Sequence, residues 1–431
     1  MLRLFRRAAT TCLSIAIGAF ALVCPFAASA QPLAGAALMA DVLRFESFGA
    51  HRYGSPGARQ ALDWIAAELR AAGFDVSDQP FTMARQFALR RATLRIGDQL
   101  LDVRPQWWLP ESPPTLRLSA PIAAAGAPAE GRIVRLSVPF DQGAYLTAAH
   151  RAALETAFAR RPTAVLLTIE HPSGEPYHYN VGQDDKPWPV PVILVGAKHR
   201  DLLDAAEAAG TPLVIEVDGE PMRDVPGRNV IGRLDRGAGR TIVVSTPVTG
   251  WDVNTCERGT GIAGFLAMAR IARERLPGVD LVFVATAGHE IGHGGMEVFI
   301  RDAAPKPPAV AAWTHFGASI ACYGWKRDGA RWVRQDQVDA RFRVLNSSES
   351  LAPQVEAAFR DVQARRLVGA QAAIGELREV RAAGYADFFG VAGLHTFFHT
   401  PADTAATTGP EILEPVVRAY ADVLSAIATG R

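Results

Sequence analysis

Two histidines and a glutamate follow the most strand-like apolar stretch of the chain. Residues 279–286 are rich in β-branched side chains, and His289, Glu290 and His293 come soon after them, among several glycines. Such a run is typical of a buried strand, and ligands of open α/β sheets bind beyond the carboxyl ends of these strands. Imidazole and carboxylate groups at that edge indicate acid–base or metal chemistry.

The sequence His-Glu-Ile-Gly-His at 289–293 has two interpretations. On a helix, H-E-x-x-H places two imidazoles on one zinc ion, with the glutamate as general base. The surrounding glycines oppose a helix, because each interior Gly costs about 1 kcal/mol relative to Ala. We therefore favour a loop at the strand end that delivers Glu290, and with it His289, to a metal. His293 is then an ordinary polar loop residue or a further possible ligand.

The composition limits the class of protein. The chain has 431 residues, of which 49% are hydrophobic, and a net charge of +1. This length is sufficient for one domain with an insertion or for two domains. The balanced charge, with no basic block beyond the first residues, gives no reason to expect nucleic acid as a partner.

The first 30 residues have the pattern of a secretory signal peptide. Three arginines precede an apolar stretch that ends in Ala-Ser-Ala at 28–30. We expect a periplasmic or secreted protein that has no membrane partner after cleavage, since no second apolar run has spanning length. Two cysteines, Cys256 and Cys322, then remain. They can bridge in an oxidising compartment or stay free, because sequence spacing does not show proximity.

Alternating helix and strand patterns predict an α/β fold. Apolar spacing predicts helices over 58–72 and 260–276, and strands over 241–245 and 279–286 flank the second helix. A strand, helix and strand in this order imply a right-handed parallel crossover. A late strand is expected over 394–399, ending at His399. A Pro-, Ala- and Ser-rich stretch opens a middle segment with strands and helices of its own.

Five separated segments carry a resemblance to a known family. They are residues 54–76, 228–234 (RNVIGRL), 257–272, 285–299 (ATAGHEIGHGGMEVF) and 397–404 (FFHTPADT). In order and spacing the chain resembles the two-zinc exopeptidases that include bacterial leucyl aminopeptidases and plasma glutamate carboxypeptidase. The resemblance implies a three-layer α/β sandwich with a mostly parallel central sheet. It also implies a smaller α/β insert similar to a protease-associated domain.

The resemblance implies a division of the chain into four parts. Residues 1–30 form the signal peptide, and 31–103 the first part of the catalytic-like domain. Residues 104–219 form the protease-associated-like insert, and 220–431 the main metallopeptidase-like domain.

The family's metal ligands are partly replaced in this sequence. Members use a His-x-Asp, a bridging Asp, a Glu-Glu pair, a later Asp and a final His. The bridging Asp aligns with Glu257, the pair with His289 and Glu290, the later Asp with His315 and the final His with His399. The His-x-Asp has no counterpart in residues 246–251.

The resemblance therefore implies an altered zinc site. Glu257, Glu290, His315 and His399 offer two carboxylates and two imidazoles, a set that suits one zinc ion better than two. His289 can replace the family's general base, because an imidazole titrates near neutrality. Alternatively His289 is a metal ligand and Glu257 is the base. A third possibility is a plain ion pair between Glu257 and Arg258 at a helix start.

Three further residues belong to the candidate site. Asp403 is expected to orient a metal-bound imidazole or to cap a turn. Asp387 lies where family members carry an acidic residue near the substrate, and Cys256 is an additional possible ligand.

These features predict an exported zinc-dependent metallohydrolase of the aminopeptidase type. Its partner would be a peptide or small amide, cleaved near a terminus by a metal-activated water. Two alternatives remain: a non-catalytic binding protein that kept the fold, and a one-metal amidase acting on a non-peptide substrate. The sequence leaves the oligomeric state open.

Overall fold

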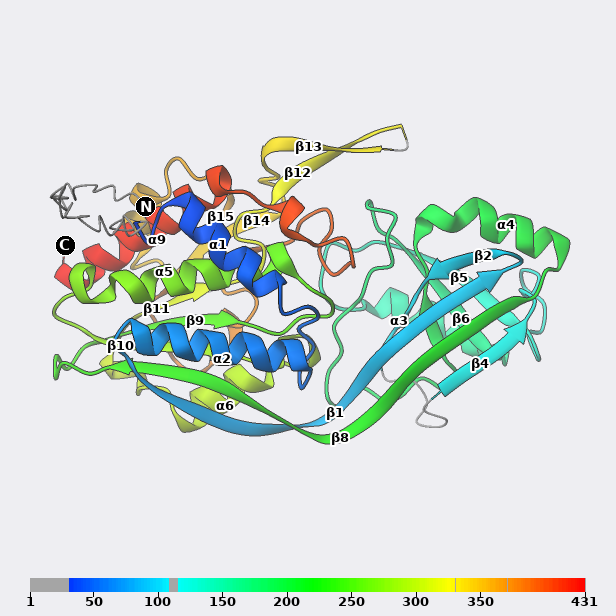
Figure 1. Ribbon diagram of the computed structural model, residues 1–431, viewed down its shortest axis with the longest axis horizontal. Helices are drawn as coiled ribbons and strands as arrows, with labels where there is room; N and C mark the ends of the chain where they lie inside the picture. Colours follow the sequence, from blue (N-terminus) through cyan, green and yellow to red (C-terminus); the bar gives the residue numbers. More distant parts are fainter. Residues whose placement is uncertain (1–30, 108–114, 330, 370, 431) are drawn as a thin grey trace, which may run out of the picture.

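A larger and a smaller sheet organise the chain into two lobes (Figure 1). The computed structural model describes residues 31–107, 115–329, 331–369 and 371–430. The expected signal peptide lies outside these residues. No helix in the described ranges is long and apolar enough to cross a membrane.

The larger sheet has ten strands in the order β15-β14-β16-β11-β9-β10-β8-β1-β2, with β4 paired to β8. Their bounds are β1 (Asp75–Ile96), β2 (Gln99–Asp102), β4 (Thr115–Ala120), β8 (Leu213–Leu234), β9 (Thr241–Pro247), β10 (Asp280–Thr286), β11 (Val310–Phe316), β14 (Arg343–Ser347), β15 (Arg365–Val368) and β16 (Phe388–Gly393).

The sheet is mixed, which corrects the expectation of a mostly parallel one. Strands β10, β9, β11 and β16 are parallel neighbours. On one side β8, β1 and β2 continue the sheet in antiparallel pairs, and on the other side β14 runs antiparallel to β16. An antiparallel neighbour needs no crossover helix, so the long β1–β8 pair extends the sheet directly.

Helices cover both faces of the larger sheet. On one face lie α1 (Gly35–Glu46), α2 (Pro56–Ala71), α5 (Thr260–Arg275) and α9 (Pro410–Thr429), as Figure 1 shows. On the other face α6 (Gly294–Asp302) and α8 (Leu377–Ala382) pack against β9, β10 and β11. The short helix α7 (Ala352–Ala358) contacts α9.

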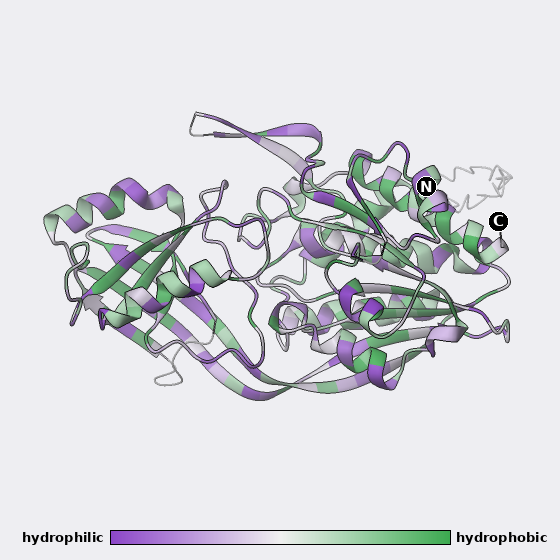
Figure 2. Cartoon of the chain, turned by 180° about the vertical axis from the view of Figure 1, so that it is seen from behind, coloured by the Kyte–Doolittle hydropathy of each residue, from purple (hydrophilic) through white to green (hydrophobic). Residues whose placement is uncertain are grey.

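Helix α5 confirms the prediction for residues 260–276 and lies at the centre of the core. Twelve of its residues are buried, because the sheet lies on one side and α1, α2 and α9 lie on the other. Its small residues permit this close packing. A Cβ added at Gly264 would lie 2.6 Å from the ring of Phe316 on β11. The apolar colouring of Figure 2 follows these inner elements.

The smaller lobe comes from the middle of the chain. Its sheet has the order β3-β7-β6-β5 and packs with two helices. The bounds are β3 (Arg104–Pro105), β5 (Ile133–Pro139), β6 (Ala164–Glu170), β7 (Val192–Leu194), α3 (Ala148–Ala159) and α4 (Arg200–Ala209). Strands β1 and β8 run unbroken from one lobe to the other (Figure 1). The expected boundary between 219 and 220 therefore falls inside β8.

The loop after β10 agrees with the sequence prediction, whereas the segment after β16 does not. After β10, His289–Ile291 form a single 3-10 turn between left-handed Gly288 and Gly292, and α6 begins only at Gly294. This confirms the loop and excludes the H-E-x-x-H helix. The strand expected over 394–399 is wrong, because β16 ends at Gly393 and the amide of Phe398 turns back to the carbonyl of His395 at 3.0 Å.

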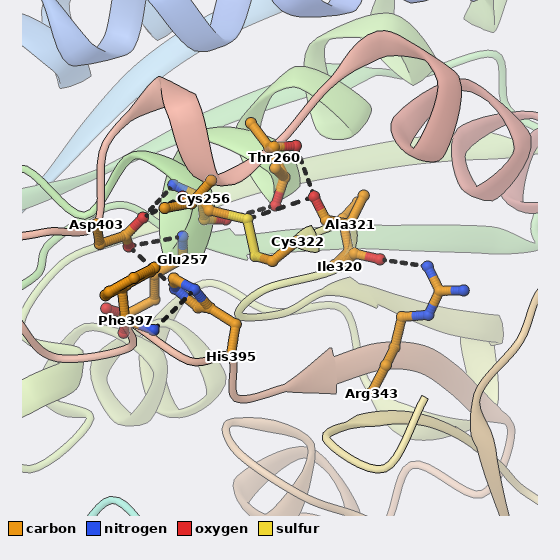
Figure 3. Close-up of a disulfide and its surroundings, with 12 residues drawn as sticks. Cys256, Glu257, Thr260, Ile320, Ala321, Cys322, Arg343, His395, Phe397 and Asp403 are labelled. Carbon is orange, nitrogen blue, oxygen red and sulfur yellow. Dashed lines mark hydrogen bonds and ion pairs between the residues drawn. A yellow bond between two sulfur atoms is a disulfide. The ribbon is translucent and has the colours of Figure 1, made fainter. Parts of the chain in front are cut away.

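A hairpin and a disulfide complete the larger lobe. The hairpin of β12 (Tyr323–Asp328) and β13 (Arg331–Val338) projects from it (Figure 1). Cys256 and Cys322 form a disulfide with a Cα–Cα distance of 5.9 Å, one of the two outcomes that the sequence left open (Figure 3). It ties the turn before α5 to the loop after β11.

Removing the disulfide should destabilise the fold. Its cysteines are 66 residues apart, so chain entropy in the unfolded state predicts a loss of roughly 4 kcal/mol for Cys256→Ala with Cys322→Ala. Urea unfolding followed by circular dichroism measures this loss. The wild-type chain under a phosphine reductant is the matched control and should behave like the double variant. A loss within about 0.5 kcal/mol, the size of ordinary surface changes, would contradict the prediction.

Candidate functional site

The carboxyl ends of four parallel strands bring the candidate residues to one edge of the sheet. Glu257 follows β9, His289 and Glu290 follow β10, His315 lies at the end of β11, and His399 follows β16. Glu257, Glu290, His315 and His399 are all buried. The predicted meeting of acidic and imidazole groups at a strand-end edge thus has a structural basis.

The guanidinium of Arg258 lies between the two glutamates. Its Nη2 atom is 3.0 Å from Oε1 of Glu257 and donates a short hydrogen bond to Oε1 of Glu290. Its Nε donates to the backbone carbonyl of Thr249 at 2.7 Å. The side chain is only 1% exposed. A fixed cation therefore stands between the carboxylates that align with two metal ligands of the resembled family.

A strained turn holds Arg258 in this position. Residues Thr255–Gly259 form one π-helical turn, entered through left-handed Asn254 with φ of 53°. The carboxylate of Asp403 accepts hydrogen bonds from the amides of Cys256 at 2.8 Å and Glu257 at 3.0 Å (Figure 3). Asp403 thus caps the turn, which is one of the two roles expected for it. The disulfide at Cys256 fixes the same turn covalently.

His399 approaches Glu257 from the other side. Its Nδ1 donates to the carbonyl of His178 at 2.8 Å, and its Nε2 lies 3.3 Å from Oε1 of Glu257. Burial alone would raise the pKa of Glu257, but the charge of Arg258 and the contact with His399 outweigh this and lower it. Glu257 is therefore the ionised partner of the arginine.

Glu290 differs from Glu257 in its ionisation. The hydroxyl of Thr249 donates to its Oε2 at 3.0 Å. Burial raises the pKa of Glu290, and Arg258 only partly offsets this because Glu257 adds a repulsive negative charge. One guanidinium thus balances one full negative charge, while the second carboxyl holds its proton more tightly.

The zinc ion implied by the resemblance does not fit this arrangement. Glu257, Glu290 and His399 would be reasonable ligands, but the guanidinium of Arg258 lies among them. A divalent ion about 3 Å from that cation would meet a repulsion on the order of 10 kcal/mol at an effective dielectric constant of 20. Zinc would require Arg258 to leave a buried position held by Thr249.

His289 and His293 are paired with acidic residues of α8 and its cap. Nδ1 of His289 lies 3.1 Å from Oε1 of Glu376, and Nδ1 of His293 lies 3.0 Å from Oε1 of Glu379. The two rings are 4.4 Å apart. Burial, and next the charge of Arg258, lower the pKa of His289 well below its usual value. His289 is therefore neutral and oriented by a carboxyl group, as a general base would need to be.

The ring of His315 is hydrogen-bonded to Ser245 and lines a cavity. Its recorded hydrogen bond joins Nδ1 to the hydroxyl of Ser245 at 2.9 Å, and it lines a cavity together with His289. Burial lowers its pKa to about 3, so the ring is neutral. Of the four expected ligands, Glu257 and Glu290 both contact Arg258 and His399 contacts Glu257, whereas His315 faces the cavity.

Two other expectations need correction. Asp387 precedes β16, so it lies at the opposite edge of the sheet from His399, where its carboxylate accepts a hydrogen bond from Ser350. Cys256 is not a free ligand, because its sulfur is bonded to Cys322. Among the described residues one group has metal-ligand geometry, Cys256, Cys322 and His395, and the disulfide occupies both of its sulfur atoms.

Three important residues were missed or undervalued in the sequence. Arg258 was considered only as a possible partner of Glu257, and its contact with Glu290 joins residues 32 positions apart. Glu376 and Glu379 occur in the ordinary polar stretch 375–381, and only their i, i+3 spacing indicates a shared helical face. No sequence motif marks either residue as a partner of a histidine.

Comparisons with known proteins identify the fold. No protein-family model matches the chain, and no curated protein sequence matches it. The structure is similar to BSAP, a zinc aminopeptidase from Bacillus subtilis, with a TM-score of 0.67 and 15% identity over 93% of this chain and 96% of that one. It is also similar to a Peptidase M28 precursor from Shewanella amazonensis, with a TM-score of 0.67 and 17% identity over 92% and 94% of the two chains.

A third similar structure extends this result. The aminopeptidase from Aneurinibacillus sp. strain AM-1 has a TM-score of 0.59 and 17% identity over 92% of this chain and 95% of that one. The chain therefore has the α/β fold of zinc-dependent exopeptidases over nearly its whole described length. Identities this low carry the fold to this chain and leave its chemistry to its own residues.

The Glu376 carboxyl should give the chain a specific dependence of stability on pH. Its full burial raises its pKa from 4.5 to about 7. In the unfolded chain Glu376 loses its proton at a lower pH than in the folded chain. The free energy of unfolding therefore falls as pH rises from about 4.5 to about 7. Glu376→Gln keeps the shape without the charge. At pH 8 it should exceed the wild type by up to about 3 kcal/mol, with near equality at pH 4.

Urea unfolding at several pH values measures this difference. The control is Glu155→Gln on the exposed face of α3, which should change neither the level nor the slope of the curve. If the free energies of unfolding of the wild type and of Glu376→Gln change in parallel from pH 4 to pH 8, the pKa of Glu376 is not raised in the folded chain.

Proposed function

We propose that this chain is a ligand-binding protein on the exopeptidase fold, in which Arg258 takes the place of the catalytic metal. The observation that carries the proposal is the guanidinium between Glu257 and Glu290. The ligand is a peptide or small amide held near the same strand ends. Hydrolysis through a metal-activated water is lost in this proposal.

Electrostatic balance supports the proposal. Two buried carboxyl groups need a nearby positive charge, and removing one partner of such a pair is costly. In this chain Arg258 supplies that charge from the same turn as Glu257, with Nε anchored to Thr249. Arg258 thus supplies a counter-charge to the ionised Glu257 without an external ion.

We further propose that the protein acts in the periplasm or outside the cell. The pattern of residues 1–30 supports export, and so does the disulfide between Cys256 and Cys322, because disulfides persist mainly in oxidising compartments.

A one-zinc hydrolase is the second candidate. The 3.3 Å separation between Nε2 of His399 and Oε1 of Glu257 favours it, since two ligands of one zinc lie about this far apart. Neither atom has a hydrogen-bond partner with good geometry among the described residues. This candidate requires Arg258 to swing away, with His289 as the neutral base.

Metal content separates the two candidates. The purified wild-type chain is dialysed with excess zinc, and unbound zinc is then removed. Inductively coupled plasma mass spectrometry should find far less than one zinc ion per chain. Arg258→Asn should gain about one zinc per chain, because removing the guanidinium frees Glu257 and Glu290 to turn toward one ion together with His399. The added zinc should also raise the thermal midpoint of this variant.

Matched variants locate any zinc that is found. Arg258→Lys keeps the cation and should stay free of zinc, and Arg258→Asn with Glu290→Gln should lose the gained ion. Stoichiometric zinc in the wild type that disappears in Glu290→Gln, together with turnover of aminoacyl anilides, would replace the binding proposal by the one-zinc hydrolase. Zinc that Glu290→Gln leaves in place lies elsewhere and leaves the proposal standing.

A further inference from the structure

A cavity of about 240 Å³ opens beside the Arg258 cluster. Its volume is that of roughly eight water molecules, or of a ligand on the order of ten non-hydrogen atoms. Both lobes contribute to it, with Gln142 and Ala144 from the smaller lobe facing the β11 and β16 ends of the larger one. Most of the remaining lining is apolar: Phe342, Val344, Ile374, Ala392, Leu394 and Phe398.

The charges around this cavity are of one sign. None of the described residues that line it is acidic, whereas Arg341 and Arg365 belong to the lining. Arg341 donates to Asp339 at 2.9 Å, so its charge is shared. The exposed side chain of Arg365 has no recorded hydrogen bond or ion pair with the described residues. Arg365 is therefore the cation available to a ligand.

Two imidazoles supply the inner polar contacts. His289 directs Nδ1 to Glu376, and His315 directs Nδ1 to Ser245, which leaves Nε2 of each ring for a ligand. Both rings line the cavity. A neutral imidazole nitrogen can donate or accept one hydrogen bond according to its tautomer. An amide group, with one donor and one acceptor, matches this pair of nitrogens.

A ligand with a free ammonium group lacks a partner in this cavity. The site carboxyl groups of Glu257 and Glu290 already contact Arg258 and do not line the cavity. Glu376 lies behind the ring of His289. An ammonium group would therefore lose water without gaining a counter-ion, which is strongly unfavourable.

From this arrangement we infer that the cavity binds a small N-acylated amino acid through its carboxylate. The apolar wall takes the side chain, the two imidazoles take the amide, and Arg365 at the rim pairs with the carboxylate. This inference rests on the proposed binding function and names its ligand class. It separates the chain from proteins that recognise a peptide by its free amino terminus.

Three probes of nearly equal size test the inference by calorimetry on the full chain, dialysed against a chelator. They are N-acetyl-L-leucine as the anion, N-acetyl-L-leucinamide as the neutral form and L-leucinamide as the cation. The anion should bind about tenfold more tightly than the neutral amide, the gain expected from one charge-assisted hydrogen bond. The cation should give no heat of binding.

Variants assign the charge preference to Arg365. Arg365→Gln should reduce the affinity for N-acetyl-L-leucine about tenfold and leave the affinity for the neutral amide unchanged. Arg360→Gln removes the same charge from an exposed position that does not line the cavity, and it should leave all three affinities unchanged. Ala144→Phe should fill the cavity and abolish binding of both acetylated probes.

Tightest binding of L-leucinamide, or equal binding of anion and neutral amide, would overturn the inference. Absence of binding by all three probes would also overturn it. These outcomes are distinct from failure of the proposed function, which would appear as zinc held by Glu290 in the wild type whichever probe binds.

Discussion

The contact of one guanidinium with two buried carboxyl groups governs the strand-end edge of this structure. Without Arg258, Glu257 and Glu290 would face each other in a low-dielectric interior and at least one would stay protonated. The π-helical turn, the Asp403 cap and the disulfide all act on the segment that carries Arg258. These constraints have a common physical result: they keep a positive charge between two buried carboxyl groups, of which Glu257 is the ionised one.

The general layout could be predicted from the sequence because it depends on local patterns. Helix α5 follows from apolar spacing, and the loop at His289 follows from glycines that allow left-handed backbone. Parallel strands bring their carboxyl ends to one edge, so the approach of Glu290 to Glu257 and His399 follows from topology. The single strand β8 was missed because Pro221, Pro226 and nearby glycines resemble breaks, yet they pair with β1.

The chemistry of the site was less predictable because it depends on where long side chains turn. Arg258 follows Glu257 in the sequence, and several rotatable bonds decide whether its charge faces solvent or Glu290. Asp387 was misplaced because an element boundary of a few residues decides whether a side chain begins or ends a strand. His315 was assigned to the metal cluster, but its ring turns to Ser245 and the cavity. Motif alignment places a residue in a loop without fixing its rotamer.

The β1–β8 ladder determines how the two lobes can move. Both strands pass between the lobes as one paired ribbon, whose register shifts once, between Leu89 and Arg91. In the described residues the two lobes are thus joined by a double strand and not by a single flexible chain. Relative motion must bend or twist a two-stranded ribbon, which resists shear along its hydrogen bonds and yields mainly by changing its coil. Movement of the smaller lobe toward the larger one therefore bends this ribbon elastically, and the energy that opposes the movement increases with its size.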